Sequence, residues 1–263
     1  AAAVEEGQGL GQQMLHQLVT EVAQDGFANL VAAGYASEGD VGNDDLILAG
    51  AGNDTVYAAN GNDEVWAGTG NDTVYGGVGN DTLYAEDGND FVDGGDGNDL
   101  ITGGIGNDSV IGGAGNDWID GEAGNDTIAG GSGVDTIYGG TGDDLMFGGE
   151  SDDIIDGGTG NDIINGGAGA DTLTGGDDAD RFVMETGFGS DTIVGGEGGL
   201  DNDTIWSTVG TDVTITLSGD EAGTISDGAS TASFTEIEVF DLGAGNDTVD
   251  GSASGAAMTV YGG

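Results

Sequence analysis

Aspartate recurs at every ninth residue over half of the chain, and this spacing is the clearest chemical signal in the sequence. From Ala49 to Val183 the sequence divides into 15 consecutive nonapeptides without insertion or deletion. The sixth position is Asp in all 15, from Asp54 to Asp180, while the fourth is Gly in 13 and the eighth is apolar in all. Such a pattern offers carboxylate and carbonyl oxygens without His or Cys, and these hard ligands select Ca²⁺ over zinc or copper.

The composition excludes several classes of protein. Among 263 residues, 50 are acidic and only Arg181 is basic, so the formal charge is −49. Nucleic-acid binding requires clustered Lys and Arg, and no apolar run approaches the roughly 18 residues that span a bilayer. The absence of Cys rules out disulfides and thiolate metal sites. We therefore expect neither a nucleic-acid partner nor membrane insertion.

The repeat also predicts the elements that must position these aspartates. Three residues around the apolar eighth position suit a very short strand with its middle side chain inward. The six residues before them turn the chain, with glycine supplying positive φ angles. Two nonapeptides make one coil, and stacked coils build two parallel sheets with a thin core. Turns two repeats apart then lie above one another, so their carboxylates converge on the gap between them.

The best-formed repeats read G-G-x-G-N-D-x-U-x, where U is apolar, as at residues 76–84. This pattern resembles the glycine- and aspartate-rich nonapeptides of the RTX (repeats-in-toxin) family, a calcium-binding motif. The resemblance and the residues together predict an all-β fold, a right-handed parallel β-roll (β-solenoid, two nonapeptides per coil) with an N-terminal helical cap and a C-terminal widened β segment. The resemblance also implies a secreted bacterial protein that leaves the cell by type I secretion.

We assign the metal-ligating carboxylates to the aspartates of the repeats and of the imperfect repeats beside them: Asp44, Asp54, Asp63, Asp72, Asp81, Asp90, Asp99, Asp108, Asp117, Asp126, Asp135, Asp144, Asp153, Asp162, Asp171, Asp180, Asp191, Asp203 and Asp247. In proteins that the chain resembles, carbonyls from positions 2 and 4 of one turn and from positions 1 and 3 of the next complete each site. The resemblance therefore implies these backbone ligands: Gly68, Gly70, Gly77, Gly79, Gly95, Gly97, Gly104, Gly106, Gly113, Gly115, Gly131, Gly133, Gly140, Gly142, Gly158, Gly160, Gly167 and Gly169.

One such site would use the carbonyls of Gly77, Gly79, Gly94 and Asp96 with the side chains of Asp81 and Asp99. Eight turns on one edge and seven on the other leave 13 gaps, so we expect about 13 calcium ions in the regular roll, with more in the flanks. Thirteen divalent ions would reduce the formal charge from −49 to about −23, which lets the chain collapse.

The flanks divide the chain into four predicted regions. Residues 1–38 carry a helical apolar stripe, which we interpret as an amphipathic cap. Residues 39–196 form the roll, beginning with an imperfect repeat that contains Asp44 and is followed by one extra residue, Leu48. Residues 197–242 alternate apolar and polar side chains, as expected of longer strands or widened coils. Residues 243–263 resume the repeat and stop within it, so we expect the parent protein to continue.

Outward aromatic side chains recur in every second repeat, which places them in columns on the sheets: Tyr57 and Tyr75, Trp66 and Tyr84, and Trp118, Tyr138 and Phe147 further along. These stacked rings either stabilise the ladder of strands or form an interaction surface for glycans or another protein. An ice-binding face would need a regular Thr or Asn array, and position 3 is Thr only at Thr69, Thr141 and Thr159.

The sequence favours a calcium-dependent structural module over an enzyme, because no Ser-His-Asp or H-E-x-x-H arrangement exists and the regular carboxylates are explained as calcium ligands. The leading expectation is a rigid segment of a secreted adhesin, surface-layer or filament protein that folds on calcium binding outside the cell. The alternative is a non-catalytic C-terminal appendage of a secreted toxin, hydrolase or epimerase.

Overall fold

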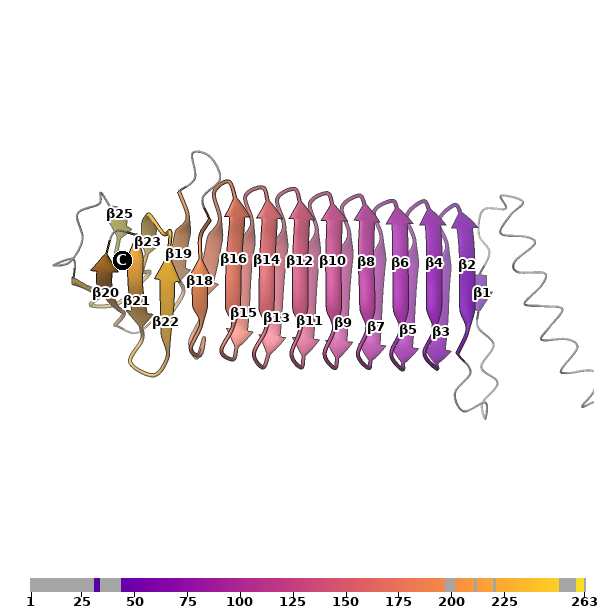
Figure 1. Ribbon diagram of the computed structural model, residues 1–263, viewed down its shortest axis with the longest axis horizontal. Coiled ribbons are helices and arrows are strands. Elements are labelled where there is room, and N and C mark those ends of the chain that lie inside the picture. The colour runs from indigo at the N-terminus through magenta and orange to yellow at the C-terminus, as the bar shows by residue number, and fades with distance from the viewer. Residues whose placement is uncertain are drawn as a thin grey trace, which may run out of the picture.

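Two long β-sheets build the molecule (Figure 1). The computed structural model describes residues 31–33, 44–196, 202–210, 212–219, 221–250 and 259–262, and these residues contain no helix. Sheet A has twelve strands, in the spatial order β1 (Val31–Ala33), β3 (Thr55–Asn60), β5 (Thr73–Val78), β7 (Phe91–Asp96), β9 (Ser109–Ala114), β11 (Thr127–Ser132), β13 (Leu145–Glu150), β15 (Ile163–Ala168), β17 (Arg181–Met184), β19 (Thr204–Ser207), β23 (Val239–Asp241) and β25 (Thr259–Tyr261).

Sheet B has thirteen strands, in the order β2 (Leu46–Ala51), β4 (Glu64–Thr69), β6 (Thr82–Asp87), β8 (Leu100–Ile105), β10 (Trp118–Ala123), β12 (Thr136–Thr141), β14 (Ile154–Thr159), β16 (Thr172–Asp177), β18 (Thr192–Val194), β22 (Thr231–Thr235), β21 (Ala222–Ser226), β20 (Thr214–Gly219) and β24 (Thr248–Asp250). Successive strands of the regular part alternate between the two sheets. The chain is therefore a parallel β-solenoid, as the repeat predicts.

Each coil of the regular part contains two nonapeptides. Val74 of β5 pairs in register with Val92 of β7, and Val92 pairs with Val110 of β9. The regular strands contain six residues, not three: the first three residues of the next repeat remain extended and continue the strand. Paired backbone explains this difference, because Gly77 and Gly95 at position 2 lie opposite one another in the ladder. The turns are correspondingly short.

Two positions of each repeat, 8 and 1, face the core of the roll. Position 8 supplies the larger residues, such as Leu83, Ile101 and Ile119, all fully buried. Position 1 also faces inward and is Gly or Ala, for example Ala85. A single aliphatic column per sheet buries little apolar area, so hydrophobic burial alone gives the roll a modest stability.

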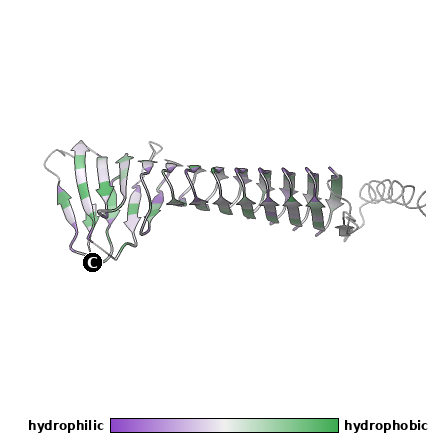
Figure 2. Ribbon diagram, turned by 90° about the horizontal axis from the view of Figure 1, so that it is seen from below, coloured by the Kyte–Doolittle hydropathy of each residue, from purple (hydrophilic) through white to green (hydrophobic). Residues whose placement is uncertain are grey.

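The C-terminal part departs from the coil. Between β18 and β24, sheet B contains the antiparallel meander β22–β21–β20, where sheet A has only β23 between β19 and β25. This widens the molecule at its C-terminal end (Figure 2). The Phe234 and Phe240 rings pack inside at 5.0 Å between centroids, beside buried Ile215, Ile225 and Ile237. The predicted widened β segment is confirmed, and it has a fuller apolar core than the roll.

Two predictions about the N-terminal flank have different outcomes. The helical cap at residues 1–38 lies outside the described residues, apart from the three that form β1 beside β3. The predicted extra residue Leu48 is wrong: Leu48 pairs in register with Trp66, and Ile47 pairs with Val65. The first repeat of the roll is therefore already in phase, because Ile47 must face the core.

Candidate metal-binding edges

The position-6 aspartates form two columns, one along each edge of the roll. One column contains nine aspartates from Asp45 to Asp191, and the other contains nine from Asp54 to Asp203. Within each column, the backbone N–H of one aspartate donates to Oδ1 of the aspartate in the next coil, over 2.6–3.0 Å. Apart from the first aspartate of each column, one carboxylate oxygen of each aspartate thereby fixes the spacing of the coils.

The second carboxylate oxygen is buried. From Asp63 to Asp180, at every ninth residue, Oδ2 has no hydrogen-bond partner, and all of these side chains are at most 3% exposed. Burying an ionised oxygen without a partner costs several kcal/mol, so native proteins pair such charges or bind a metal there. These Oδ2 atoms recur in every coil, along both edges of the roll. They are the feature of the fold that most needs a cation.

The pKa values of these aspartates reflect the same burial. Desolvation is the largest cause in each case, and it raises the pKa of Asp81 and Asp117 to about 6 and that of Asp126 to about 7. Repulsion from neighbouring carboxylates in the column adds to the shift, as for Asp180, whose pKa rises to about 8. Nearby positive charge would reverse this effect, because an opposite charge favours the ionised form.

Backbone carbonyls project into the gaps between turns. A methyl group on Gly76 would lie 2.6 Å from Oδ2 of Asp81 and 2.5 Å from the carbonyl oxygen of Gly94 in the next coil. Methyl groups on Gly95 and Gly97 would overlap the carbonyl oxygens of Gly77 and Gly79, respectively. Five of the six predicted ligands of this gap are therefore placed at or along it: Gly77, Gly79, Asp81, Gly94 and Asp99, whose Oδ1 accepts the Asp81 N–H.

The sixth predicted ligand already has a partner. The carbonyl oxygen of Asp96 accepts a hydrogen bond from the backbone N–H of Gly79 at 2.8 Å. A carbonyl oxygen has two lone pairs, so this hydrogen bond leaves one for a cation. The same bond recurs along the edges, as between Gly61 and Val78.

The backbone has positive φ at position 2, near the end of each strand, and at position 4, in the turn, and glycine occupies most of these positions. Gly77 and Gly79 have φ of 111° and 144°. At position 2, Ala59, Glu86 and Glu122 replace glycine with φ of 84°, 75° and 68°. Side chains with a Cβ are strained in this region by about 1–2 kcal/mol. The sequence thus accepts backbone strain at these sites.

Asparagine at position 5 forms a second ladder outside the aspartates. The backbone N–H of such a residue donates to Oδ1 of the asparagine or aspartate at position 5 one coil earlier, as from Asn98 to Asn80 and from Asn116 to Asn98, both at 2.8 Å. The asparagine bonds therefore point toward earlier coils, whereas the aspartate bonds point toward later ones. Each coil is held to the next by both ladders.

Seventeen of the nineteen predicted aspartates lie in the two columns. The prediction for Asp44 is corrected by the structure. Asp45 takes the register place that was predicted for Asp44, because its N–H donates to Asp63 Oδ1. Asp44 is exposed and lies in the asparagine ladder, where its Oδ1 accepts the Asn62 N–H. Asp247 belongs to neither column; its Oδ1 accepts the N–H of Val213 in the widened part.

Glu238 continues one column, and the sequence pattern gave no sign of it. Its Oε2 accepts the N–H of Asp203 at 2.8 Å, the place of an aspartate oxygen elsewhere. Glutamate reaches this N–H with one methylene more than aspartate has. The pairing of β19 with β23 could have indicated Glu238, but no nonapeptide motif marks it.

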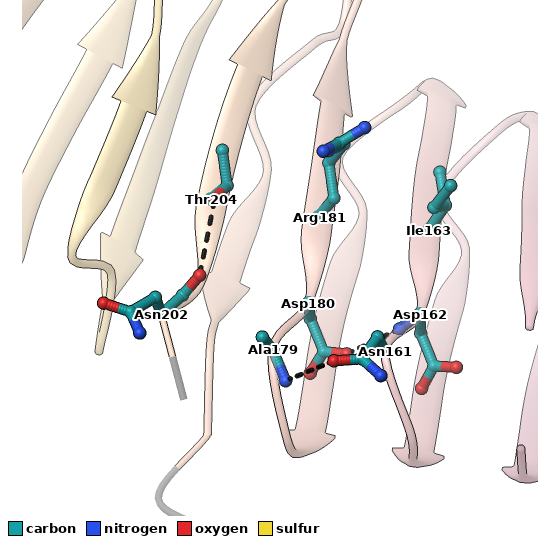
Figure 3. Close-up of a pocket in the computed structure, with 8 residues that line it drawn as sticks. All are labelled: Asn161, Asp162, Ile163, Ala179, Asp180, Arg181, Asn202 and Thr204. Carbon is teal, nitrogen blue, oxygen red and sulfur yellow. Dashed lines mark hydrogen bonds between the residues drawn. The ribbon is translucent and has the colours of Figure 1, made fainter. Parts of the chain in front are cut away.

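The end of the regular column opens into a small pocket (Figure 3). Asp162 and Asp180 line it from successive coils, with Arg181, Asn202 and Thr204 beside them. Arg181 lies above the Trp206 ring at 5.5 Å from its centroid. The only basic side chain of the chain is thus engaged on the sheet face rather than with the column.

Most of the predicted outward aromatic rings contact another ring in the same sheet. The rings of Tyr57 and Tyr75 are 4.9 Å apart and nearly parallel, and those of Trp66 and Tyr84 are 4.2 Å apart. The Trp118 and Tyr138 rings are tilted at 5.7 Å on sheet B. Phe147 lies alone and exposed on sheet A.

The donor set fits Ca²⁺, which takes six to eight oxygen ligands in flexible geometry. Among the described residues, no group of three or more His, Cys, Asp or Glu side chains gathers at one point; each gap instead offers two aspartates and several carbonyls. The described part of the chain also contains no helix long and apolar enough to cross a membrane.

A comparison with family models matches the chain to the RTX calcium-binding nonapeptide repeat. The matches are residues 39–74, 66–101, 75–110, 93–128, 102–137, 129–164, 156–187 and 237–254. Together they cover more than half of the sequence, including both edges of the roll. A comparison with curated proteins gives no significant match.

Proposed function

The chain belongs to the family of RTX calcium-binding nonapeptide repeat proteins, and we propose that its roll folds only when calcium fills the gaps along both edges. The observation that carries this proposal is the row of buried Oδ2 atoms without partners, from Asp63 to Asp180. Ca²⁺ supplies the positive charge that these oxygens lack. The chain's own residues do the rest: Oδ1 sets the coil spacing, and Oδ2 and the turn carbonyls hold the ion.

Sixteen gaps separate the aspartates of the two columns. Thirteen are those predicted from the regular repeats, and three more lie between Asp45 and Asp63, Asp171 and Asp191, and Asp180 and Asp203. Sixteen divalent ions would lower the formal charge from −49 to about −17. Self-repulsion would keep the ion-free chain open, so binding and folding form one equilibrium.

We propose that the folded roll serves as a rigid segment of a secreted adhesin, surface-layer or filament protein. A calcium-poor cytosol would keep the chain open for export, and millimolar calcium outside would fold it. The rod shape (Figure 1) favours this role over the alternative, a non-catalytic appendage of a secreted enzyme or toxin. Glycan binding is less favoured, because the stacked rings of Tyr57 and Tyr75 cover the faces that a sugar would contact.

The test is a calcium titration followed by circular dichroism, with magnesium at equal ionic strength as the control. Calcium alone should convert the chain cooperatively to β-structure, since Mg²⁺ demands short octahedral bonds and keeps its waters. Isothermal titration calorimetry should give close to 16 bound ions. A chain already folded in chelator would overturn the proposal of folding by calcium.

A further inference from the structure

One face of the rod carries almost no charge, although the chain has a formal charge of −49. We call it face A: the outward side chains at positions 7 and 9 of β3 to β19 in sheet A. Of these 18 side chains, only Asp93 and Arg181 are charged. Exposed large apolar residues on this face include Ile111, Phe147 and Trp206. A continuous neutral face on such an acidic protein marks an interaction surface.

We propose that face A is the interface of a homodimer in which two copies pack face to face and run in opposite directions. Asp93 lies on β7 and Arg181 on β17, at equal distances from the midpoint between β11 and β13. A two-fold axis along the strands at that midpoint places β7 of one copy opposite β17 of the other. Asp93, at position 9, then lies two positions along the strand from Arg181 of the second copy, at position 7, and the long arginine side chain can span that offset. The dimer therefore contains two Asp93–Arg181 pairs, in each of which one copy supplies the aspartate and the other the arginine.

The side-chain sizes of the four central strands also match under this symmetry. Strand β11 faces β13, so the small Ala129 lies opposite Phe147 and Thr127 lies opposite Leu145. Strand β9 faces β15, so Ser109 lies opposite Ile163. A large side chain thus meets a smaller one at each of these positions, as interdigitating packed sheets require. The central strands of face A are self-complementary in shape.

A dimer with the copies running in the same direction has none of these features. Each strand would then face the same strand of the second copy, running the opposite way, which brings the two Asp93 side chains together and the two Arg181 side chains together. Phe147 would also meet Leu145 of the second copy, one large side chain against another. Like charges in a desolvated interface cost several kcal/mol, so face A selects the antiparallel arrangement.

Face A is large enough for a weak dimer. Positions 7 to 9 of nine strands spaced about 4.8 Å apart form a band about 10 Å wide and about 40 Å long, or about 400 Å² per copy, which is at the low end for transient interfaces. The regular strands lie in line in Figure 1, and flat sheets over many strands are typically stabilised by stacking. The acidic columns lie along the edges, outside face A. A basic partner would find no acidic side chain other than Asp93 on this face.

The inference rests on the calcium-dependent folding proposed above, so its test separates folding from association. The 263-residue chain is studied in saturating calcium by sedimentation velocity over a range of concentrations, while circular dichroism reports folding. We expect a concentration-dependent dimer. Phe147→Glu should weaken dimerisation at least tenfold. Tyr138→Glu on sheet B is the matched control, because Tyr138 is 36% exposed and Phe147 is 39% exposed, and it should leave dimerisation unchanged.

Charge reversal tests the pairing. Asp93→Arg and Arg181→Asp should each weaken the dimer, and the two together should restore it, because each charge still faces its opposite. Since the chain has no cysteine, a single spin-labelled cysteine at Thr55 reports the direction: about 45 Å between labels for the antiparallel dimer and about 10 Å for a parallel one. A folded monomer at all concentrations, a dimer insensitive to Phe147→Glu, or the short distance would each overturn the proposal.

Discussion

Each position-6 aspartate performs two separate tasks with its two oxygens. In Asp117, Oδ1 accepts the N–H of Asp99, and its own N–H donates to Oδ1 of Asp135. Oδ2 of Asp117 is buried and has no hydrogen-bond partner. Asparagine could keep the first role but not the charge, and glutamate reaches the same N–H only with one more methylene group, as Glu238 does at the end of its column. Aspartate is the one side chain that both sets a short coil spacing and presents a charge to the gap.

Asp117→Asn should separate these tasks. The variant retains an acceptor for Asp99 but removes a negative charge shared by two gaps. We expect the loss of one or two calcium ions per chain and a decrease of about 3 kcal/mol in the free energy of unfolding in saturating calcium. Atomic absorption after equilibrium dialysis measures the ions. Asp96→Asn is the control, because the proposed ligand there is the backbone carbonyl; an equal loss from both variants would contradict the assignment.

Strain at position 2 yields a stabilising substitution. Glu86 has φ of 75°, and its carboxylate adds to burial in raising the pKa of Asp72. Glu86→Gly removes the left-handed strain, and the gain exceeds the backbone entropy cost of glycine by about 1 kcal/mol. Thermal unfolding in saturating calcium measures the change. Glu150→Gly at position 3 removes the same charge without relieving positive φ and should give no gain; equal stabilisation would attribute the effect to charge alone.

At the scale of the edge columns, the raised pKa values set a pH dependence. Burial raises the pKa of Asp99 to about 6, Asp144 to about 7 and Asp180 to about 8 from the ordinary 3.8. The ion-free folded chain therefore binds protons more tightly than the unfolded chain. That stabilisation is complete below about pH 4 and is lost as the pH rises through 6 to 8.

We accordingly expect opposite responses with and without calcium. In calcium-free buffer, protonation of these aspartates should shift the equilibrium towards the folded roll as the pH falls from 8 to 5, because it removes part of the charge that calcium otherwise neutralises. In calcium, protons compete for the same Oδ2 atoms, so the calcium concentration at half-folding should rise over the same range. Circular dichroism at a series of pH values measures both. Calcium-free stability that increased with pH would show that these aspartates are not buried as carboxylates in the folded chain.

The strict nine-residue phase explains why the columns could be predicted from the sequence. A parallel coil repeats its register at every second nonapeptide, so a constant phase places each aspartate above another without further information. The six-residue strands were not predictable in this way, because Gly-Gly reads as a turn and its extension depends on pairing with Gly-Gly in the next coil. Asp45 and Glu238 were missed where the motif is imperfect, and there the inward Ile47 and the paired β23 determine the register.

At the scale of the whole molecule, the rod joins two kinds of stabilisation end to end. The regular roll has one aliphatic residue per nonapeptide in its core and rows of buried carboxylates along its edges. The widened part, β19 to β24, has an apolar core around Phe234 and Phe240 and only the last members of the columns. We therefore expect the folding of the two parts to depend unequally on calcium: without calcium, the widened part should stay folded while the roll unfolds.

This difference predicts which amides remain protected in chelator. Hydrogen exchange measured by mass spectrometry should show residual protection in residues 204–241 and little in residues 49–183. Phe240→Ala, which removes a fully buried ring, should abolish that residual protection, because such a truncation costs about 3–5 kcal/mol. Ile119 in the middle of the roll is equally buried, and Ile119→Ala should reduce the protection of amides only in the presence of calcium. If both parts exchanged equally fast in chelator, the widened part would depend on calcium as the roll does, and folding would have to propagate from the columns alone.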